Sequence, residues 1–530
     1  MVRQGDPLSP YIFLICVEFL GCLIRKNKNI GGITIENVDC KITQYADDST
    51  VILDGSDKSL IETLNTLDLF ERLSGLKINE DKTNVIYIGS LRNKKSIPNL
   101  TNKKLNWVKD GKFSALGVDF TIKVDEMVEL NYYRVMESVT KLMKHWSKRN
   151  LTVFGRITVV KSILIPKFNH LVLSIPNPSK DFVKTLKKHI YEFIWKGKTD
   201  KISRDQLSND YPDGGLRLVQ VDLFFEALKC TWIRRILNGN IDNKGFILFS
   251  KLTGMNIDDL EKGASYTLRV ASKVKNAFWR EVLVSWSKIK SKHVPVVLDD
   301  ILKSCLWNNE HFKIGGKEFN YKKWRVAGIV FVTDLIHAYE NRFLFWNEIE
   351  ARYGFRTNYL EYNSVINAIK NNFKHIFQAN VHVASISRPF IPFHFSLILR
   401  DKKGCKSLCN QLLDTIVPKA KQKWSDKMGL QFSDQEWKAY NLIPFKCTID
   451  VKLRWFQYRV LNRILTTNTC MYNIGQRNSL CTFYNDESET IKHLFTECKK
   501  VKPILAQLQT WIYQKLDIPI ILDQKHSLWN

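Results

Sequence analysis

The sequence lacks a hydrophobic run long enough to cross a lipid bilayer. A spanning helix needs about 20 mostly apolar residues. The longest apolar run, from Tyr11 to Ile24, is shorter and carries Glu18, so we expect a buried helix there and no membrane anchor. No charged stretch followed by a small-residue cleavage site precedes this run, and we therefore expect no secretory signal.

Cysteine spacing of the kind found in disulfide frameworks is also missing. The 11 cysteines are scattered from Cys16 to Cys498, whereas small secreted domains place theirs in dense, regular patterns. This distribution favours a reducing compartment, and we expect a nuclear or cytoplasmic protein.

Acidic residues are scarce relative to basic ones. The chain has 80 Lys and Arg against 53 Asp and Glu, a formal net charge of +27. Such a balance indicates a polyanionic partner, nucleic acid first and an anionic membrane surface second. The imbalance is sharpest between Lys141 and Lys167, where seven basic residues occur without one acid. A phosphate backbone would explain this density, and a solvated helix face is the alternative.

Helical and strand patterns alternate over the first 90 residues. Ser9 can cap a helix that Pro10 opens. The apolar face of that helix comprises Tyr11, Leu14, Ile15, Phe19 and Ile24. Alternating apolar residues predict a strand over 38–42, with its return at 50–53. A second helix is expected from Asp57 to a glycine stop at Gly75, followed by a strand at 84–89, a basic loop at 90–104 and a strand pair near 113–121.

Two adjacent carboxylates, Asp47 and Asp48, lie at the connection of the first strand pair, within QYADDSTVILDG at 44–55. Aspartate is common in solvated turns because its side chain bonds nearby backbone donors. Neighbouring like charges repel, however, and favour a counterion. A divalent metal is the usual one.

Three ordered motifs decide between these interpretations. They are VRQGDPLSPYIFLICVEFL at 2–20, QYADD at 44–48 and SGLKINEDKTNVIYIG at 74–89. Together they resemble the second half of the palm of LINE-type (non-LTR) retrotransposon reverse transcriptases, and LGV at 116–118 fits the primer-grip strand pair. The resemblance implies an α+β fold: a partial palm, ααββ with the YADD hairpin, and then a mostly α-helical thumb and C-terminal region.

The resemblance also implies roles for single residues. Asp47 would be a direct ligand of the two Mg²⁺ ions that activate the primer 3′-hydroxyl and stabilise the leaving pyrophosphate, with Asp48 its less critical neighbour. Tyr45 is expected to pack beneath the hairpin. Lys82 aligns with a lysine near the departing phosphate, although an exposed loop lysine is an equal alternative. Template and nucleotide contacts are expected from Arg3, Gln4, Gly5, Tyr45 and Lys82.

One half of the two-metal site has no counterpart in the sequence. Such a site needs carboxylates from separate strands, and in this family the other aspartate lies upstream of QGDPLSP, where this chain has only Met1 and Val2. Asp54, Asp57 and Asp119 fall on elements with other roles. We therefore expect a fragment of an RNA-directed DNA polymerase that acts, when intact, in target-primed reverse transcription and does not polymerise alone. A nucleic-acid-binding protein without catalysis is the alternative.

Residues 145–171, 191–207 and 213–220 are similar to the thumb that follows the palm in these elements. A basic thumb face would track the backbone of an RNA template and a DNA primer or target, with deoxynucleoside triphosphates as substrates of the intact enzyme. The candidate backbone-binding residues are Lys144, Lys148, Arg149, Arg156 and Lys161. For each of them a solvated face is the alternative, while Trp146 and Trp195 are expected in the core.

The C-terminal region holds a Cys/His cluster and a basic stripe. Residues 324–355 and 450–468 are similar to the same elements, and Arg454, Arg459 and Arg463 share the stripe. Relatives have a Cys-Cys-His-Cys zinc knuckle, and this chain has Cys481, His493 and Cys498 with Tyr484 at the second cysteine position.

Phenol is a poor zinc ligand because its pKa is about 10. Either a water or a borrowed Cys470 completes a weak Zn²⁺ site, or the knuckle is degenerate and packs as an apolar turn, which we favour. The expected domains are a partial palm at 1–123, a thumb and linker at 124–240, a helical linker at 241–440 and a C-terminal domain at 441–530.

Overall fold

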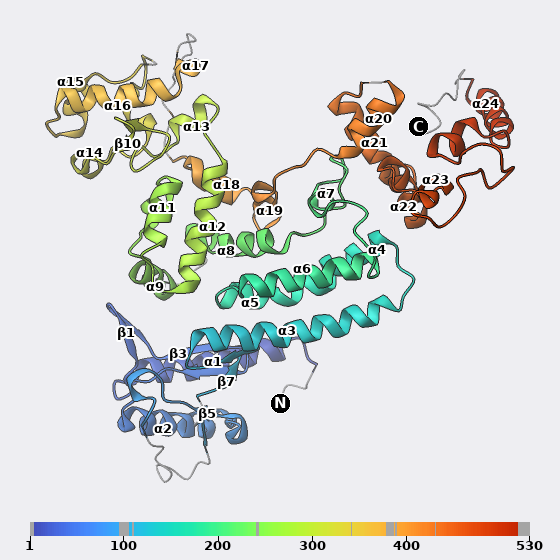
Figure 1. The fold of residues 1–530 in the computed structure, drawn as a ribbon. Coiled ribbons are helices and arrows are strands. Elements are labelled where there is room, and N and C mark those ends of the chain that lie inside the picture. Colours follow the sequence, from blue (N-terminus) through green and yellow to red (C-terminus); the bar gives the residue numbers. More distant parts are fainter. Residues whose placement is uncertain are drawn as a thin grey trace. The chain divides into compact units, whose positions relative to one another are not determined.

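The computed structural model describes residues 5–94, 105–108, 111–239, 243–340, 342–377, 386, 389–429 and 431–517 (Figure 1). Arg3, Gln4 and most of the predicted basic loop lie outside these residues. The chain divides into two compact units, each built from three stretches of sequence. Unit 1 comprises residues 1–134, 170–178 and 225–412, and unit 2 comprises residues 135–169, 179–224 and 413–530. The domain boundaries at 123, 240 and 440 stay a prediction.

Helices and short strands alternate in the first part of unit 1. The elements are α1 (Ser9–Lys26), β1 (Ile33–Ile35), β2 (Val38–Cys40), β3 (Ile42–Tyr45), β4 (Asp48–Val51), α2 (Asp57–Ser74), η1 (Glu80–Lys82), β5 (Asn84–Val85), η2 (Gly89–Leu91), β6 (Asn106–Trp107), β7 (Phe113–Ala115), β8 (Val118–Phe120) and α3 (Val124–Ser147). Each described sheet here has two strands: β1–β2, β3–β4 and β7–β8 are antiparallel, and β5–β6 is parallel. A small core joins α1, α2 and β3 through Leu20, Ile24, Ile30, Ile42 and Phe70.

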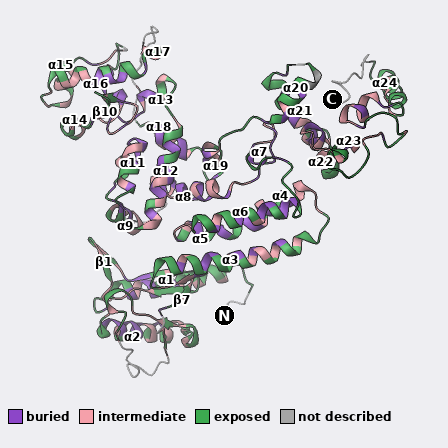
Figure 2. Cartoon of the chain, viewed as in Figure 1, coloured by how far each residue is buried: buried purple, intermediate pink, exposed green. Residues whose placement is uncertain are grey.

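The second part of unit 1 is mostly helical and has its own large core. Its elements are α9 (Asn243–Thr253), α10 (Ile257–Glu261), α11 (Ala264–Ala271), α12 (Ala277–Lys292), α13 (Leu298–Leu302), β9 (Lys313–Ile314), β10 (Lys317–Glu318), α14 (Lys322–Val326), η5 (Val332–Leu335), α15 (Trp346–Tyr353), α16 (Tyr359–Asn372), α17 (Lys374–Phe377), α18 (Phe393–Leu399) and α19 (Lys406–Leu412). Most of α8 (Val221–Leu237) also belongs to it. Buried positions run through α8, α12 and α18 (Figure 2).

The regular elements in the described part of unit 2 are helices, joined by loops. It contains the end of α3, then α4 (Val153–Val159), η3 (Val160–Leu164), η4 (Ile165–Phe168), α6 (Lys180–Trp195), α7 (Arg204–Ser208), α20 (Lys419–Met428), α21 (Asp434–Lys446), α22 (Val451–Leu461), α23 (Asn468–Tyr472), η6 (His493–Glu497) and α24 (Lys502–Leu516). Its C-terminal core gathers around Trp424, Trp437 and Leu461. With 58% helix and 7% strand, the chain has the expected α+β composition.

The helical run Val153–Ser174 changes character twice. It passes from α4 through the π-helical turn η3 and the 3-10 turn η4 to α5 (Asn169–Ser174). Pro166 opens η4 and cannot donate a backbone hydrogen bond, which accounts for the irregular turns. Among the described residues this is the one run with the length and composition of a membrane-spanning helix, and 44% of its most apolar window is buried in the protein. Core helices share these properties.

The predicted buried face of α1 is wrong except at Ile24. Leu14, Ile15 and Phe19 are 52%, 71% and 46% exposed, whereas Val17, Leu20 and Ile24 are buried. The helix is apolar on most of its circumference, so the pattern could not indicate which side meets β3 and α2. Ser9 is the first helical residue and makes no side-chain cap; Leu8 occupies the N-cap position.

The single strand predicted over 38–42 is two strands. The chain turns at Lys41, which is buried and donates a hydrogen bond from Nζ to the carbonyl oxygen of Asn27 at 2.9 Å. β2 therefore pairs with β1, and β3 pairs with β4. The strand predicted at 84–89 is shorter, because only Asn84 and Val85 pair.

Candidate metal and nucleic-acid sites

Asp47 occupies a tight turn between β3 and β4. The ladder pairs Ile42 with Val51 and ends with Tyr45 opposite Asp48, which leaves Ala46 and Asp47 as the two turn residues. Ala46 has a φ of 52°, the left-handed backbone that suits a two-residue hairpin turn but disfavours a residue with a Cβ by about 1 kcal/mol. The strained turn presents Asp47 and Asp48 to solvent, since both are exposed.

The hairpin is attached to α1. Ile42 is buried in the core that α1 shares, and Gln44 Nε2 donates to the carbonyl oxygen of Val17 at 2.9 Å. Gln44 thus positions the strand that leads to Asp47. Our prediction did not include Gln44. Its position as the first residue of the QYADD motif was the signal that could have identified it.

Tyr45 does not pack beneath the hairpin. Its side chain is 70% exposed, so the expected burial is wrong. Tyr45 and Asp48 form the last pair of the ladder, and no third strand joins β3 or β4 within the described part of the chain. Lys82 is exposed at the end of η1, and Gly5 is exposed with a φ of 95°.

The other nearby acids are engaged elsewhere. Asp54 Oδ1 accepts a hydrogen bond from the Ser56 backbone N–H at 2.9 Å, and Asp57 pairs with Lys94 at 2.6 Å. Asp119 pairs with Arg134. Over the residues that the structure describes, no third metal-ligating side chain gathers with Asp47 and Asp48. The hairpin tip therefore supplies carboxylates from one side only, which does not meet the needs of a two-metal site.

The basic residues predicted to contact phosphates differ in exposure. Lys144, Lys148 and Arg149 are exposed, and the Arg149 guanidinium lies 4.2 Å from the centroid of the Trp146 ring. Lys161 is half-buried. Arg156 is 2% exposed, and its Nη1 donates to the carbonyl oxygen of Phe193 at 2.6 Å. Arg156 is therefore a core residue, which corrects our prediction, because its side chain bridges α4 and α6 inside unit 2.

The arginine stripe of α22 is likewise used internally. Arg454 Nε donates to the carbonyl oxygen of Thr448 at 2.6 Å, and Arg463 Nη1 to that of Lys423 at 2.9 Å. Burial lowers the pKa of Arg459 below its usual value. The Arg454 and Arg463 guanidinium groups hold backbone within unit 2, and Arg459 lies over the Phe456 ring, so the three do not form the free stripe that the sequence suggested.

The glycine turn at 213–215 docks onto α22. Tyr458 Oη donates to the carbonyl oxygen of Gly214 at 2.9 Å, and Gln206 Nε2 donates to Asn462 Oδ1 at 2.7 Å. Trp195 is buried, as expected, with its ring centroid 6.5 Å from that of Trp455. Residues 191–220 and 450–468, which each resemble the same family, therefore pack against each other in unit 2.

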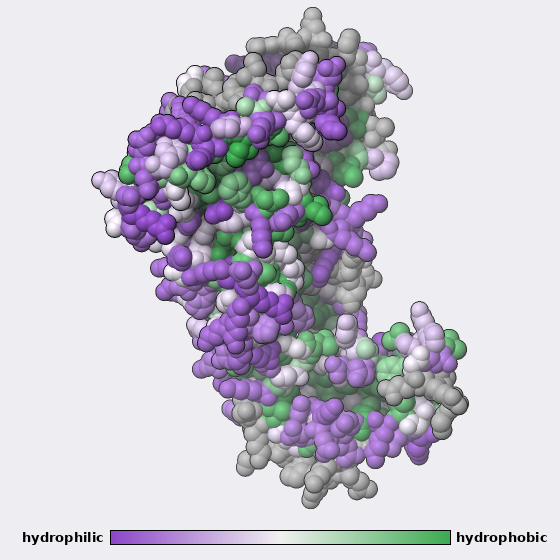
Figure 3. All heavy atoms as spheres, turned by 90° about the vertical axis from the view of Figure 1, so that its right-hand side faces the viewer, coloured by the Kyte–Doolittle hydropathy of each residue, from purple (hydrophilic) through white to green (hydrophobic). Residues whose placement is uncertain are grey.

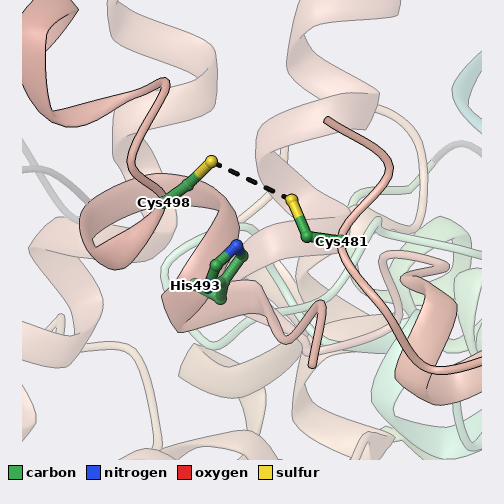
Figure 4. A group of neighbouring side chains, drawn as sticks. All are labelled: Cys481, His493 and Cys498. Atoms are coloured by element: carbon green, nitrogen blue, oxygen red, sulfur yellow. Dashed lines mark hydrogen bonds between the residues drawn. The ribbon is translucent and has the colours of Figure 1, made fainter. Parts of the chain in front are cut away.

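Cys481, His493 and Cys498 converge in unit 2 (Figure 4). All three are buried, their ligand atoms lie within 4.8 Å of one another, and the two Sγ atoms are 4.0 Å apart. Two thiolates of a tetrahedral zinc site with Zn–S bonds of about 2.3 Å are about 3.8 Å apart. The turn at η6 creates this geometry: it carries His493, and the Cys498 N–H donates to the His493 carbonyl oxygen at 2.9 Å.

Tyr484 stands beside this cluster. Its Oη lies 3.2 Å from His493 Nε2 and 3.3 Å from Glu487 Oε2, and the same carboxylate lies 3.1 Å from His493 Nδ1. Desolvation raises the pKa of Tyr484 above its ordinary value, so the phenol stays protonated at neutral pH. Cys470 is exposed on α23 and is not part of the group. The residues therefore fit a zinc ion with three protein ligands.

Comparison with known proteins agrees with both sites. Residues 1–120 match the family described as reverse transcriptase (RNA-dependent DNA polymerase), and residues 421–504 match the family described as zinc-binding in reverse transcriptase. Two separate segments of the chain are therefore similar to parts of reverse transcriptases.

The relatives narrow the class. The chain is 22% identical over 97% of its length to an uncharacterized 149 kDa protein of transposon TX1 from Xenopus laevis, of which it spans 42%. It is 38% identical over 16% of its length, and 11% of the relative, to the retrovirus-related Pol polyprotein of the type-1 retrotransposable element R2 from Popillia japonica. The family matches and both relatives thus agree with the resemblance to LINE-type (non-LTR) reverse transcriptases that the motifs predicted.

Proposed function

We propose that this region supplies the YADD hairpin, the thumb and a C-terminal zinc knuckle to an RNA-directed DNA polymerase that acts in target-primed reverse transcription. The observation that carries the proposal is the hairpin tip: Asp47 and Asp48 are exposed on a strained turn inside the segment that matches reverse transcriptases. The two carboxylates would hold Mg²⁺, which organises phosphoryl transfer in polymerases. RNA template, DNA primer and deoxynucleoside triphosphates are the partners of the intact enzyme.

We further propose that residues 1–530 bind nucleic acid but do not polymerise on their own. The support is the absence, among the described residues, of a third ligating side chain near Asp47 and Asp48. The exposed cations of Lys144, Lys148 and Arg149 remain available for backbone contacts. A binding protein without catalysis is the second candidate function, and the same observation favours it.

Primer extension separates these possibilities. The purified chain is given a labelled DNA primer on an RNA template, with all four deoxynucleoside triphosphates and Mg²⁺, and binding is measured separately by fluorescence anisotropy. We expect binding without incorporation, and equal affinity for Asp47→Ala. Incorporation that Asp47→Ala abolishes would overturn the proposal that this chain is inactive alone.

The polymerase role itself is tested in the intact element. Asp47→Ala placed there should reduce target-primed synthesis to background, while Asp48→Asn should retain part of the activity. Synthesis that survives Asp47→Ala would show that this hairpin is not the catalytic one, and would leave the catalytically inactive binding protein as the better proposal.

We propose that Cys481, His493 and Cys498 hold a weakly bound zinc ion with a structural role. The three buried ligand atoms support it, and the protonated Tyr484 phenol at the position of a fourth ligand accounts for the weakness. Glu487, next to both Tyr484 and His493, would orient the imidazole, as carboxylates near zinc-bound histidines do.

A further inference from the structure

The hairpin β9–β10 and helix α14 concentrate positive charge on a small part of unit 1. Between His311 and Thr333 the chain has five Lys and Arg and one acid. The exposed lysines of this segment are Lys313, Lys317, Lys322 and Lys323. We call these four residues the hairpin lysines. This region lies outside both family matches.

A rigid aromatic core supports the hairpin lysines. The ring of Trp307 lies 5.9 Å from Phe319 and 6.4 Å from Trp324, and Tyr321 is 5.8 Å from Phe319, all measured between centroids. Trp307 Nε1 also donates to the carbonyl oxygen of Ile329 at 2.8 Å. Trp307 and Trp324 are fully buried. The lysines are therefore carried on elements whose backbone is already ordered, so less conformational entropy is lost when the surface binds a ligand.

Acids within the segment do not compensate its positive charge. Glu318 is the one acid of the segment, and Arg269 on α11 neutralises it at 2.6 Å. Within the described residues none of the hairpin lysines forms an ion pair. Four like charges on one short segment repel one another, and a polyanion would relieve that repulsion.

The tip of the hairpin offers close backbone approach. Gly315 and Gly316 form the two-residue turn, with φ values of 57° and 78°, and a Cβ at either position would meet only open space. Left-handed backbone at both positions favours glycine. With no side chains at the tip, a phosphate can reach the backbone N–H groups between Lys313 and Lys317.

The basic surface continues into a hollow. Arg269, which reaches Glu318 on β10, lines a cavity of about 460 Å³ together with Tyr266 and Lys273. In Figure 1 the hairpin lies beside α14 and α16.

We propose that the hairpin lysines bind the phosphodiester backbone of a nucleic acid, without sequence preference, at a site separate from the YADD hairpin. The inference rests on the proposed function for the presence of nucleic acid near this chain. Three observations favour the phosphodiester backbone as the bound feature: the positive charge, the ordered support and the open glycine tip. Phosphate contacts provide affinity without base readout.

Lysine footprinting tests the surface directly. The full chain is acetylated alone, with a 30-nucleotide RNA, or with DNA of the same sequence, and modification is quantified by mass spectrometry. We expect several-fold protection of the hairpin lysines, and unchanged modification of the exposed Lys402 and Lys403. Protection by RNA alone or by DNA alone identifies the natural source of the backbone. Absence of protection by either one overturns the proposal.

Charge removal provides the second test. The variant Lys317→Gln/Lys322→Gln/Lys323→Gln should reduce the salt dependence of binding, with the log–log slope falling by about 2 for three lost contacts on a single strand. The matched control is Lys402→Gln/Lys403→Gln/Lys406→Gln, which removes equal charge elsewhere in unit 1 and should leave the slope unchanged. Circular dichroism confirms that both variants fold.

A third variant keeps this inference distinct from the proposed function. Lys144→Gln/Lys148→Gln/Arg149→Gln removes the thumb cations. If the slope falls in that variant and not in the hairpin variant, the further inference is wrong and the proposed thumb contact stands. If the slope falls in the hairpin variant and not in the thumb variant, the hairpin surface stands and the thumb contact is wrong.

Discussion

Lys229 carries its ammonium group into the interior of unit 1. Its Nζ donates to the carbonyl oxygen of Ile175 at 2.8 Å, pairs with Glu281 Oε2 at 3.1 Å, and lies 3.9 Å from the ring centroid of Phe278. Burial lowers the pKa of Lys229 from 10.5 to about 8, with Glu281 opposing the shift. The side chain is fully buried, so this shift is a statement about stability.

The expected consequence is a pH dependence with a defined sign. Between pH 8 and pH 10.5 the unfolded chain keeps a proton that folded Lys229 has released, so the free energy of unfolding rises with pH, by about 3 kcal/mol over the window. Urea midpoints followed by tryptophan fluorescence at pH 8 and pH 10 measure it. Lys229→Met should remove this rise and the exposed-site control Lys402→Met should keep it; an equal rise in Lys229→Met would contradict the assignment.

Tyr484 decides how tightly the C-terminal cluster holds metal. Tyr484→Cys adds a thiol that forms a thiolate ligand far more readily than the phenol does, because the unperturbed thiol pKa is about 8.5. Zinc retained after a chelator wash should rise from well below one ion per chain toward one, as measured by plasma mass spectrometry. Phe483→Cys adds a thiol at the adjacent exposed position and should change little. Near-stoichiometric zinc in the unaltered chain would count against a weak site.

At the scale of elements, alanine substitutions at two glycines of the thumb-like region are expected to have opposite effects on stability. A Cβ on Gly215 would meet the Asn209 carbonyl oxygen at 2.0 Å, whereas a Cβ on Gly155, inside α4, would meet Leu151 at an ordinary 3.4 Å. Gly215→Ala should therefore destabilise unit 2 by about 1 to 3 kcal/mol. Gly155→Ala should be neutral or stabilising by up to about 1 kcal/mol, because alanine favours helix. Thermal unfolding of both variants checks this, and equal midpoints would contradict the close approach of Gly215 to Asn209.

Local signals were sufficient for some elements and insufficient for others. α2 begins after Ser56, whose side chain accepts from the Ser59 N–H, and ends at Gly75 in left-handed backbone, as predicted. These caps are local chemistry, so the sequence carries them. The covered side of α1 depends instead on which residues of β3 and α2 pack against it, and the periodicity of a mostly apolar helix does not contain that information.

At the scale of the whole molecule, charge dominates what the chain can bind. Hydrophilic residues cover large areas of the face drawn in Figure 3, and the net charge is +27. We expect binding to nucleic acid of any sequence, with an affinity for single strands that falls by at least about 300-fold between 50 and 200 mM salt if six or more phosphates are neutralised. Anisotropy titrations of two unrelated 30-nucleotide RNAs across this range measure it. A tenfold preference for one sequence, or binding insensitive to salt, would contradict backbone recognition.

The sequence by itself determined the resemblance to reverse transcriptases, the position of Asp47 and Asp48 at a hairpin connection, and the three residues of the Cys/His cluster. These depend on the order and spacing of short motifs, which are properties of the chain as written. Only the tertiary structure decided that Arg156 is buried, that Tyr45 is exposed, and that Tyr458 bonds Gly214 across 244 residues of sequence. The burial of a residue and its hydrogen-bond partners depend on which distant segments of the chain pack together. Net charge and periodicity contain no information about that packing.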